Sequence, residues 1–108
     1  MQVAKLGDPD TCAVTQALAF IGSKWTPLVV VNLFLGPKRY GELQRALPRI
    51  SPKTLADRLR ALEEQRIVTR TVHPDTPPRV EYTLTDRGRR LGEILNAVAE
   101  WADATPVR

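Results

Sequence analysis

The clearest apolar pattern in the chain lies between Ser51 and Gln65. Leucines recur there at positions 55, 59 and 62, a spacing that places three side chains on one face of a helix. Ser51 can cap the first free backbone N–H groups, and Pro52 suits the first helical position because its missing N–H would have no partner there. The polar positions are Lys53, Asp57, Arg60 and Glu64 on the opposite face, with Thr54 and Arg58 on its flank. The pattern predicts a helix that packs on one side and leaves the other side free for a partner.

A shorter helical pattern precedes this one. Residues 41–47, GELQRAL, carry apolar side chains at Leu43, Ala46 and Leu47. The next three residues, Pro48-Arg49-Ile50, cannot easily continue a helix into Ser51, because proline lacks the N–H and restricts the residue before it. Helix, tight turn and second helix over about residues 41–65 form the outline of a helix-turn-helix.

A first helix is predicted near the N-terminus. Val14, Leu18 and Ile21 recur at helical spacing, and a glycine at position 22 ends the pattern. The loop before it offers two alternative caps, Asp10 or Thr11.

The next segment, LVVVNLFL at residues 28–35, is ambiguous by propensity. Three consecutive valines favour a strand. However, Thr26 can cap a helix, Pro27 suits its first position, and Gly36-Pro37 would end it. The length of the segment and these end signals predict a buried helix.

Beyond Gln65 the apolar period changes from helical to alternating, over residues 68–73 and again over residues 80–84. This change predicts a two-stranded hairpin over about residues 67–84. The connection, PDTPPR at residues 74–79, contains three prolines and cannot pair as a strand. We expect it to project as a stiff arm that ends in the cation of Arg79.

The last helix is predicted to span about residues 86–103, with Thr85 as its cap. Its first turns contain Gly88 and Gly92, which weaken a helix. Trp101 lies on the flank of the apolar stripe. That stripe is broad and consists of Leu91, Ile94, Leu95, Val98 and Ala102.

Length and composition narrow the possibilities. A chain of 108 residues with 43% hydrophobic and 26% charged residues fits one globular domain over residues 1–108. The longest apolar run is far short of the roughly 20 residues of a membrane span, and the first residues lack the apolar core of a signal peptide. We therefore expect a cytoplasmic, unprocessed protein.

The positive charge is concentrated in one part of the chain. The whole chain carries a formal net charge of +4. Residues 37–70 contain nine basic and four acidic residues, a local net charge of +5, so the remainder is slightly negative. The excess lies in and around the predicted helix-turn-helix, as neutralisation of DNA phosphates would require. The alternative is a solvated polar face.

The order of elements is four helices, two strands and a helix, which predicts a mainly α winged helix-turn-helix with a small β-hairpin as the wing. In this order the chain resembles the HxlR family of small bacterial transcriptional regulators, from Cys12 to Trp101. The motifs that carry the resemblance are IGSKWT at 21–26, GPKRYGEL at 36–43, ISPKTL at 50–55, Arg58-Leu59 with Leu62-Glu63, and PPRVEYTLT at 77–85. Ser23 and Ala13 depart from the usual pattern, where glycine and proline are common.

The resemblance implies a homodimeric repressor or activator that binds double-stranded DNA, with the first and last helices forming the dimer. We expect a transcriptional regulator, a repressor, that reads an inverted repeat and responds to an oxidant or small-molecule effector. The alternative is a winged helix that serves as a protein-interaction module without DNA, since the fold alone supports both uses.

The candidate DNA contacts fall into three groups. Ser51, Lys53, Thr54 and Arg58 lie in the first two turns of the recognition helix, the part that enters the major groove in a helix-turn-helix. Arg58 or Lys53 can bond guanine, while Ser51 can hold a phosphate, cap the helix, or do both. The candidate backbone contacts are Arg79 at the wing and Lys38, Arg39 and Arg45 beside the recognition helix.

Other chemistry finds little support in the sequence. One histidine and one cysteine cannot supply the three or four ligands of a zinc site, and no nucleophile with a matched base or phosphate-binding glycine loop is present. We expect no metal, no cofactor and no catalysis. Trp25 and Trp101 are core or interface residues.

Cys12 stands at the start of the first helix, where the helix dipole favours a thiolate while the nearby Asp10 opposes it. Some HxlR-family members sense oxidants or electrophiles through a cysteine near this position. The residue is thus a candidate redox sensor, and the alternative is an inert buried cysteine.

Overall fold

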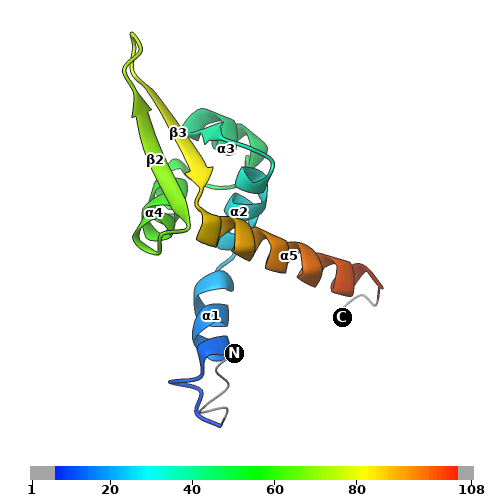
Figure 1. Cartoon of the computed structure of the whole chain (residues 1–108). Coiled ribbons are helices and arrows are strands. Elements are labelled where there is room, and N and C mark those ends of the chain that lie inside the picture. Colours follow the sequence, from blue (N-terminus) through cyan, green and yellow to red (C-terminus); the bar gives the residue numbers. More distant parts are fainter. Residues whose placement is uncertain (1–6, 105–108) are drawn as a thin grey trace.

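The computed structural model describes residues 7–104. Its helices are α1 (Ala13–Ile21), α2 (Thr26–Phe34), α3 (Tyr40–Ala46), α4 (Pro52–Glu64) and α5 (Asp86–Ala104). Its strands are β1 (Lys38–Arg39), β2 (Val68–His73) and β3 (Arg79–Leu84). Helices α2 to α4 and the sheet form a compact head, while α1 and α5 extend away from it as two arms (Figure 1). The predicted fold class, a mainly helical winged helix-turn-helix, is confirmed.

The core of the head is formed by the apolar stripes that the sequence indicates. Leu55, Leu59 and Leu62 of α4 are almost fully buried. They pack against Val29, Val30 and Leu33 of α2 and against residues of α3, the turn and the sheet. The predicted helix over segment 28–35 is confirmed up to Phe34, because packing of one face outweighs the strand propensity of the valines. It is not buried all round, since Leu28, Val31 and Phe34 are exposed.

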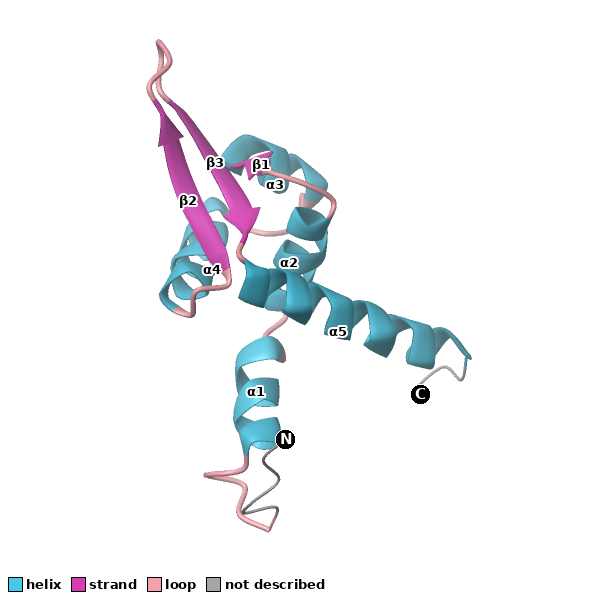
Figure 2. Ribbon diagram, viewed as in Figure 1, coloured by secondary structure: helices cyan, strands magenta, loops and turns pink. Residues whose placement is uncertain are grey.

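The sheet has one strand more than predicted. Its order is β1-β3-β2, with both pairs antiparallel (Figure 2). Residues 38 and 39, which were expected only to precede a helix, pair with Tyr82 and Glu81 of β3. A two-residue strand is too short to show alternation, so the pattern could not reveal it. Strand β1 ties the start of α3 to the base of the wing.

Two of the predicted helix caps are wrong. The residue before α1 is Cys12, not Asp10 or Thr11, and Thr26 is the first residue of α2 instead of its cap. The Thr26 backbone N–H donates to Ser23 Oγ at 3.2 Å, so the serine that departs from the family pattern caps this end. The caps Ser51 and Thr85 are confirmed, because their hydroxyls accept the N–H of Thr54 at 3.1 Å and of Gly88 at 3.0 Å.

The two glycines of α5 are packing positions. A Cβ on Gly88 would lie 2.2 Å from the Ile67 carbonyl oxygen, and a Cβ on Gly92 would lie 2.3 Å from the Phe34 ring. Both glycines are buried. They lower helix propensity, as expected, but they let α5 cross the head at close range.

The arms carry apolar side chains that the head does not cover. Helix α1 has no buried residue, and in α5 only Gly88 and Gly92 are buried. Leu91 and Leu95 pack on the core, so only part of the broad apolar stripe expected in α5 is covered. The exposed apolar residues of the arms are Val14, Leu18, Ile94, Val98 and Trp101. Trp25, by contrast, is partly buried against the core.

No single helix among residues 7–104 is long and apolar enough to cross a membrane. Helices α1 and α2 reach the length and hydropathy of a span only when they are taken together, and the chain bends by 82° between them.

Candidate nucleic-acid interface

The N-terminal end of α4 is a capped, exposed helix start. Ser51 Oγ accepts the Thr54 N–H and donates to Thr54 Oγ1 at 2.8 Å. Ser51, Pro52 and Lys53 are exposed, and Thr54 is partly buried. The capping role of Ser51 is therefore filled, and a phosphate at this end would meet the remaining helix N–H groups and the positive end of the helix dipole.

The cations of α4 differ in their pairing. Asp57 receives both Lys53 and Arg60, each at 3.4 Å. Lys53 has a side chain that is 87% exposed, so this pair is weak and easily exchanged for a phosphate. Arg58 is partly buried and has no ion pair among the described residues. Of the cations on this helix, Arg58 is the one whose charge no carboxylate offsets.

The turn between α3 and α4 is fixed by two side chains that sequence reasoning did not single out. Tyr40 Oη donates to the Pro52 carbonyl oxygen at 2.7 Å. Gln44 Nε2 donates to the Ile50 carbonyl oxygen at 2.6 Å, and Gln44 Oε1 is buried without a partner. Together they hold the first helix of the motif against the start of the second, which sets the angle of the recognition helix. Hydrogen bonds from the first helix of the motif to the turn leave no periodic signal in a sequence.

The basic residues beside the recognition helix lie on β1 and α3. Lys38 is partly buried, and Arg39 and Arg45 are exposed. The Arg39 N–H donates to Glu42 Oε1 at 2.8 Å, so the start of α3 is capped by its own acidic residue. Arg45 lies in the last turn of α3, where a cation also stabilises the helix dipole.

Arg79 does not end a free arm. It is the first residue of β3, its Nε donates to Asp75 Oδ2 at 3.1 Å, and its Nη1 lies 3.6 Å from Glu81 Oε2. Glu81 also bonds His73 Nε2 at 2.9 Å. The cation at the end of the wing connection is thus held by two carboxylates that are also near it in sequence, four residues before it and two residues after it.

The structure nevertheless brings two of the predicted cations together. Arg39 and Arg79 line one hollow of about 530 Å³ between the start of α3 and the wing loop. The strand pairing explains this, since Arg39 lies opposite Glu81, two residues from Arg79. The wing and the recognition helix lie on the head, away from the ends of both arms (Figure 1). Ser51, Lys53, Thr54 and Arg58 form a second group on α4.

Cys12 lies at the start of α1, away from the core of the head. It is 7% exposed, but it is not part of the buried core cluster. The backbone N–H of Thr15, followed by that of Val14, lowers the pKa of the Cys12 thiol, and burial only partly opposes them. No second cysteine is present in the chain. Among residues 7–104, no group of three histidine, cysteine, aspartate or glutamate side chains is placed to hold a metal ion.

Comparison with known proteins identifies the type of domain. The family model described as HxlR-like helix-turn-helix matches residues 20–107. The uncharacterized HTH-type transcriptional regulator YvaP of Bacillus subtilis is 40% identical over 81% of each chain. The HTH-type transcriptional regulator YodB of the same organism is 42% identical over 81% of this chain and 78% of its own.

Solved structures agree with this assignment. The reduced form of YodB superposes with a TM-score of 0.80 at 39% identity, covering 89% of this chain and 95% of YodB. Its diamide-treated form gives 0.77 at 38% identity, over 91% and 98%. The oxidized form of the redox regulator HypR gives 0.80 at 37% identity, over 90% and 100%. With a helix-turn-helix on a basic head and a family match over most of its length, this chain belongs to the HxlR family of helix-turn-helix transcriptional regulators, which are DNA-binding proteins and not enzymes.

Proposed function

We propose that the protein is a homodimeric, sequence-specific repressor that binds an inverted repeat in double-stranded DNA and acts in the cytoplasm. The observation that carries the proposal is the division of the surface. Residues 37–70, which include the recognition helix, carry a net charge of +5, while Val14 and Leu18 of α1 and Ile94, Val98 and Trp101 of α5 leave exposed apolar side chains on both arms. One chain thus has a basic surface suited to DNA phosphates and an exposed apolar surface suited to a protein interface.

The recognition helix supports sequence-specific reading. Its first two turns expose Lys53 and present Arg58 without a carboxylate partner. An arginine or lysine can bond guanine O6 and N7 together, the commonest specific contact in the major groove. Lys38, Arg39, Arg45 and Arg79 would neutralise phosphates on either side, which adds affinity without sequence preference.

The arms support a twofold dimer. Val14 and Leu18 of α1 are 62% and 61% exposed, and Val98 and Trp101 of α5 are 53% and 64% exposed. Large apolar side chains that remain exposed in this number favour an interface between identical chains. A dimer joined through α1 and α5 would hold two recognition helices at a fixed separation, so half-sites about one helical turn of DNA apart, or a multiple of it, are expected.

Cys12 supports regulation by oxidants or electrophiles. The N–H groups of Thr15 and Val14 lower the pKa of its thiol, and the thiolate is the reactive form. YodB has been solved in reduced and diamide-treated forms, and HypR is named a redox regulator. Modification at the start of α1 would act on an arm that we assign to the dimer. With one cysteine per chain, the available products are a disulfide between subunits, a mixed disulfide or an alkylated thiol.

The test is selection of genomic DNA fragments by the purified protein at moderate salt. We expect enrichment of fragments that share an inverted repeat, with affinity that falls steeply as salt rises. If no fragment is preferred over any other, the protein is not a sequence-specific regulator, and the alternative of a protein-interaction module is favoured.

The regulatory part is tested on the selected operator. Wild type and Cys12→Ser are titrated with and without diamide or a quinone. We expect release of DNA only from the wild type. Equal responses of the two proteins would show that Cys12 is not the sensor.

A further inference from the structure

The wing carries four ionisable side chains close together, which we call the wing cluster. Its members are His73 at the end of β2, Asp75 in the connection, and Arg79 and Glu81 of β3. His73 and Arg79 are register partners, and Glu81 lies two residues further along β3, so these three side chains share one face of the sheet. The cluster lies near the end of the wing that projects from the head (Figure 1).

Glu81 links the members of the wing cluster. Its Oε1 lies 2.9 Å from His73 Nε2, and its Oε2 lies 3.6 Å from Arg79 Nη1. Arg79 also donates from Nε to Asp75 Oδ2 at 3.1 Å. The Glu81 side chain is 27% exposed and that of Asp75 is 55% exposed, so water screens the pair with Asp75 more strongly. Arg79 is therefore held by one well-screened carboxylate and by one that it shares with His73.

The charge of the wing cluster depends on His73. While His73 is neutral, two carboxylates face one arginine, a net charge of −1, and protonation of His73 brings the net charge to zero. Histidine is the side chain that ordinarily changes charge between about pH 5 and 8. His73 is the only histidine of the chain. A single proton thus decides whether carboxylates outnumber cations in the cluster.

Ionisable groups outside the wing cluster approach it from β1 and α3. Arg39 of β1 lies opposite Glu81 in the register and lines a hollow together with Arg79. Tyr40 of α3 lines the same hollow, and its hydroxyl donates to a carbonyl oxygen at the start of α4. Glu42 of α3 accepts the backbone N–H of Arg39. Among residues 7–104, no cation of the cluster pairs with a carboxylate outside it.

The opposite face of the sheet is the one that packs on the head. It carries Val68, Tyr82 and Leu84, which belong to the same core as the leucines of α4. The charged strand residues that alternate to this face are Lys38 and Arg70. Helix α4 therefore packs on the side of β2 away from the wing cluster, and its charges do not face His73.

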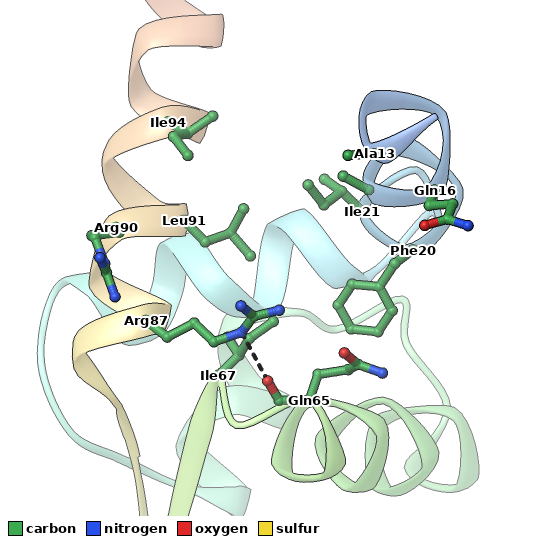
Figure 3. A pocket seen from close by; sticks show the side chains of 11 residues that line it. Ala13, Gln16, Phe20, Ile21, Gln65, Ile67, Arg87, Arg90, Leu91 and Ile94 are labelled. Carbon is green, nitrogen blue, oxygen red and sulfur yellow. Dashed lines mark hydrogen bonds between the residues drawn. The ribbon is translucent and has the colours of Figure 1, made fainter. Parts of the chain in front are cut away.

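The wing cluster is also separate from the arms. A hollow of about 740 Å³ lies between α1 and α5, with Ile21 and Ile94 among its walls (Figure 3). This hollow belongs to the surface that we assign to the dimer. The wing points away from it, at the other side of the head (Figure 1). A change of charge in the cluster can thus act on bound DNA without contact with the dimer surface.

We propose that Glu81 and His73 are positioning residues of the wing, and that protonation of His73 releases Arg79 from Glu81 to a DNA phosphate. The inference rests on the proposed DNA binding and adds a control by pH to it. While His73 is neutral, Glu81 and Asp75 both attract the Arg79 guanidinium. Charged His73 pairs with Glu81, so that a phosphate competes for Arg79 with the screened carboxylate of Asp75 alone.

The direction of the pH effect follows from linkage between DNA binding and protonation. A phosphate beside the wing favours the charged form of His73, so the DNA-bound protein keeps this proton to a higher pH than the free protein does. Affinity for DNA is therefore greatest at low pH and falls as pH rises through the range in which the bound histidine loses its proton. Each chain takes up at most one proton at this site.

The test is fluorescence anisotropy titration of the selected operator at about pH 6 and about pH 8, in the Cys12→Ser background so that the thiol does not titrate. We expect binding at least about threefold tighter at the lower pH. The fall of affinity with salt should also be steeper there, by about one phosphate contact per chain. His73→Gln keeps a side chain that can bond Glu81 but takes up no proton, so it should bind equally at both pH values. Arg79→Gln should remove most of the pH dependence, because His73 acts through the arginine.

A second variant is expected to gain affinity, which misfolding would not produce. Glu81→Gln leaves Arg79 held by Asp75 alone, so it should bind at the higher pH about as tightly as the parent protein does at the lower pH. The gain should disappear when Arg79→Gln is added. The matched control is Glu64→Gln, which removes the same charge from an exposed position of α4 outside the cluster and should keep the pH dependence.

Three results would overturn the inference. Operator binding that is equal at both pH values is the first, and a pH dependence that survives His73→Gln is the second, since another group would then cause it. The third is an unchanged pH dependence in Arg79→Gln, because His73 would then act on DNA without the arginine. A protein that prefers no DNA fragment at either pH would instead contradict the proposed function, and the inference with it.

Discussion

Helix α4 of the head and helix α5 of the arm differ in how far their apolar stripes are buried. In α4, a helix of 13 residues, all three leucines are buried against α2 and the sheet. In α5, a helix of 19 residues, the only buried residues are two glycines, and Ile94, Val98 and Trp101 are exposed. The two helices have similar amphipathic patterns in sequence. Within one chain, however, the apolar stripe of α4 is fully buried and part of the stripe of α5 stays exposed.

The difference teaches how a small chain divides its apolar surface. Each helix of the head has one stripe covered by other elements, whereas α1 packs chiefly on α2, and α5 chiefly on α2 and β3, and both extend away from the head (Figure 2). Burial of apolar area is a main favourable contribution to folding and to association alike. We therefore expect changes in the head to affect the stability of each chain, and changes in the arms to affect association.

The largest effect is expected in the head. Leu59→Ala removes a side chain that is 1% exposed and leaves a cavity, which should lower the free energy of unfolding by about 2–5 kcal/mol. Chemical denaturation at a chain concentration low enough to avoid association measures it. Val98→Ala in the arm is the matched control, and an equal loss in both variants would remove the distinction between head and arms.

The junction of head and arm should be nearly as sensitive. Glycine to alanine in a helix normally stabilises it. At Gly88 the new Cβ would meet the Ile67 carbonyl oxygen, which is backbone and cannot move freely, so Gly88→Ala should destabilise by about 1–3 kcal/mol. Thermal unfolding shows whether the variant is more or less stable than the wild type. A raised melting temperature would mean that α5 is not held at this distance from the Ile67 backbone.

The recognition helix offers a comparison within the head. Arg58→Ala should weaken operator binding by about 1–3 kcal/mol and blur sequence preference, because it removes a cation that no carboxylate offsets. Arg60→Ala is the matched control on the same helix, since Arg60 is exposed and paired with Asp57. Fluorescence anisotropy with operator and shuffled DNA measures both. Equal losses for Arg58 and Arg60 would assign the effect to net charge alone.

The arms are tested by association. Trp101→Ala should weaken the dimer by about tenfold, because a large exposed aromatic residue at an interface contributes on the order of 1.4 kcal/mol or more, while the unfolding of the isolated chain changes little. Sedimentation equilibrium over a range of concentrations measures the dissociation constant. A wild type that is monomeric at micromolar concentration would contradict the assignment of the arms as the dimer interface.

The smallest effect concerns the thiol at the start of α1. Because the Thr15 and Val14 N–H groups lower the pKa of Cys12, its alkylation by iodoacetamide should reach half of its maximal rate at a lower pH in the native protein than in urea. The rate rises as pH rises through the folded-state pKa, since the thiolate is the nucleophile. Coincident native and denatured curves would show that the helix start does not favour the thiolate.

Much of the fold could be predicted from the sequence, because periodicity and end signals report local structure. The stripe of Leu55, Leu59 and Leu62 and the cap Ser51 are examples, and both are confirmed. Strand β1 and the packing role of Gly88 and Gly92 could not be predicted, since they depend on contacts between distant segments.

The candidate site was predictable to a similar degree. The segment of positive charge indicated the recognition helix, but the pairing of Arg79 with Asp75 and Glu81 and the bonds of Tyr40 and Gln44 appear only in three dimensions. The turn of the wing brings Asp75 back to Arg79, while Glu81, two residues further along β3, lies on the same face of the strand as Arg79.

The close crossing at Gly88 makes α5 a lever. Its 19 residues span about 28 Å at roughly 1.5 Å per residue, and its pivot is the contact of Gly88 with the Ile67 carbonyl oxygen. A tilt of about 5° at that pivot would displace the far end, with Trp101, by about 2 Å over such a length. In a symmetric pair the displacement occurs twice. Small repacking where α5 meets the head would thus be amplified into a change in the distance between two recognition helices.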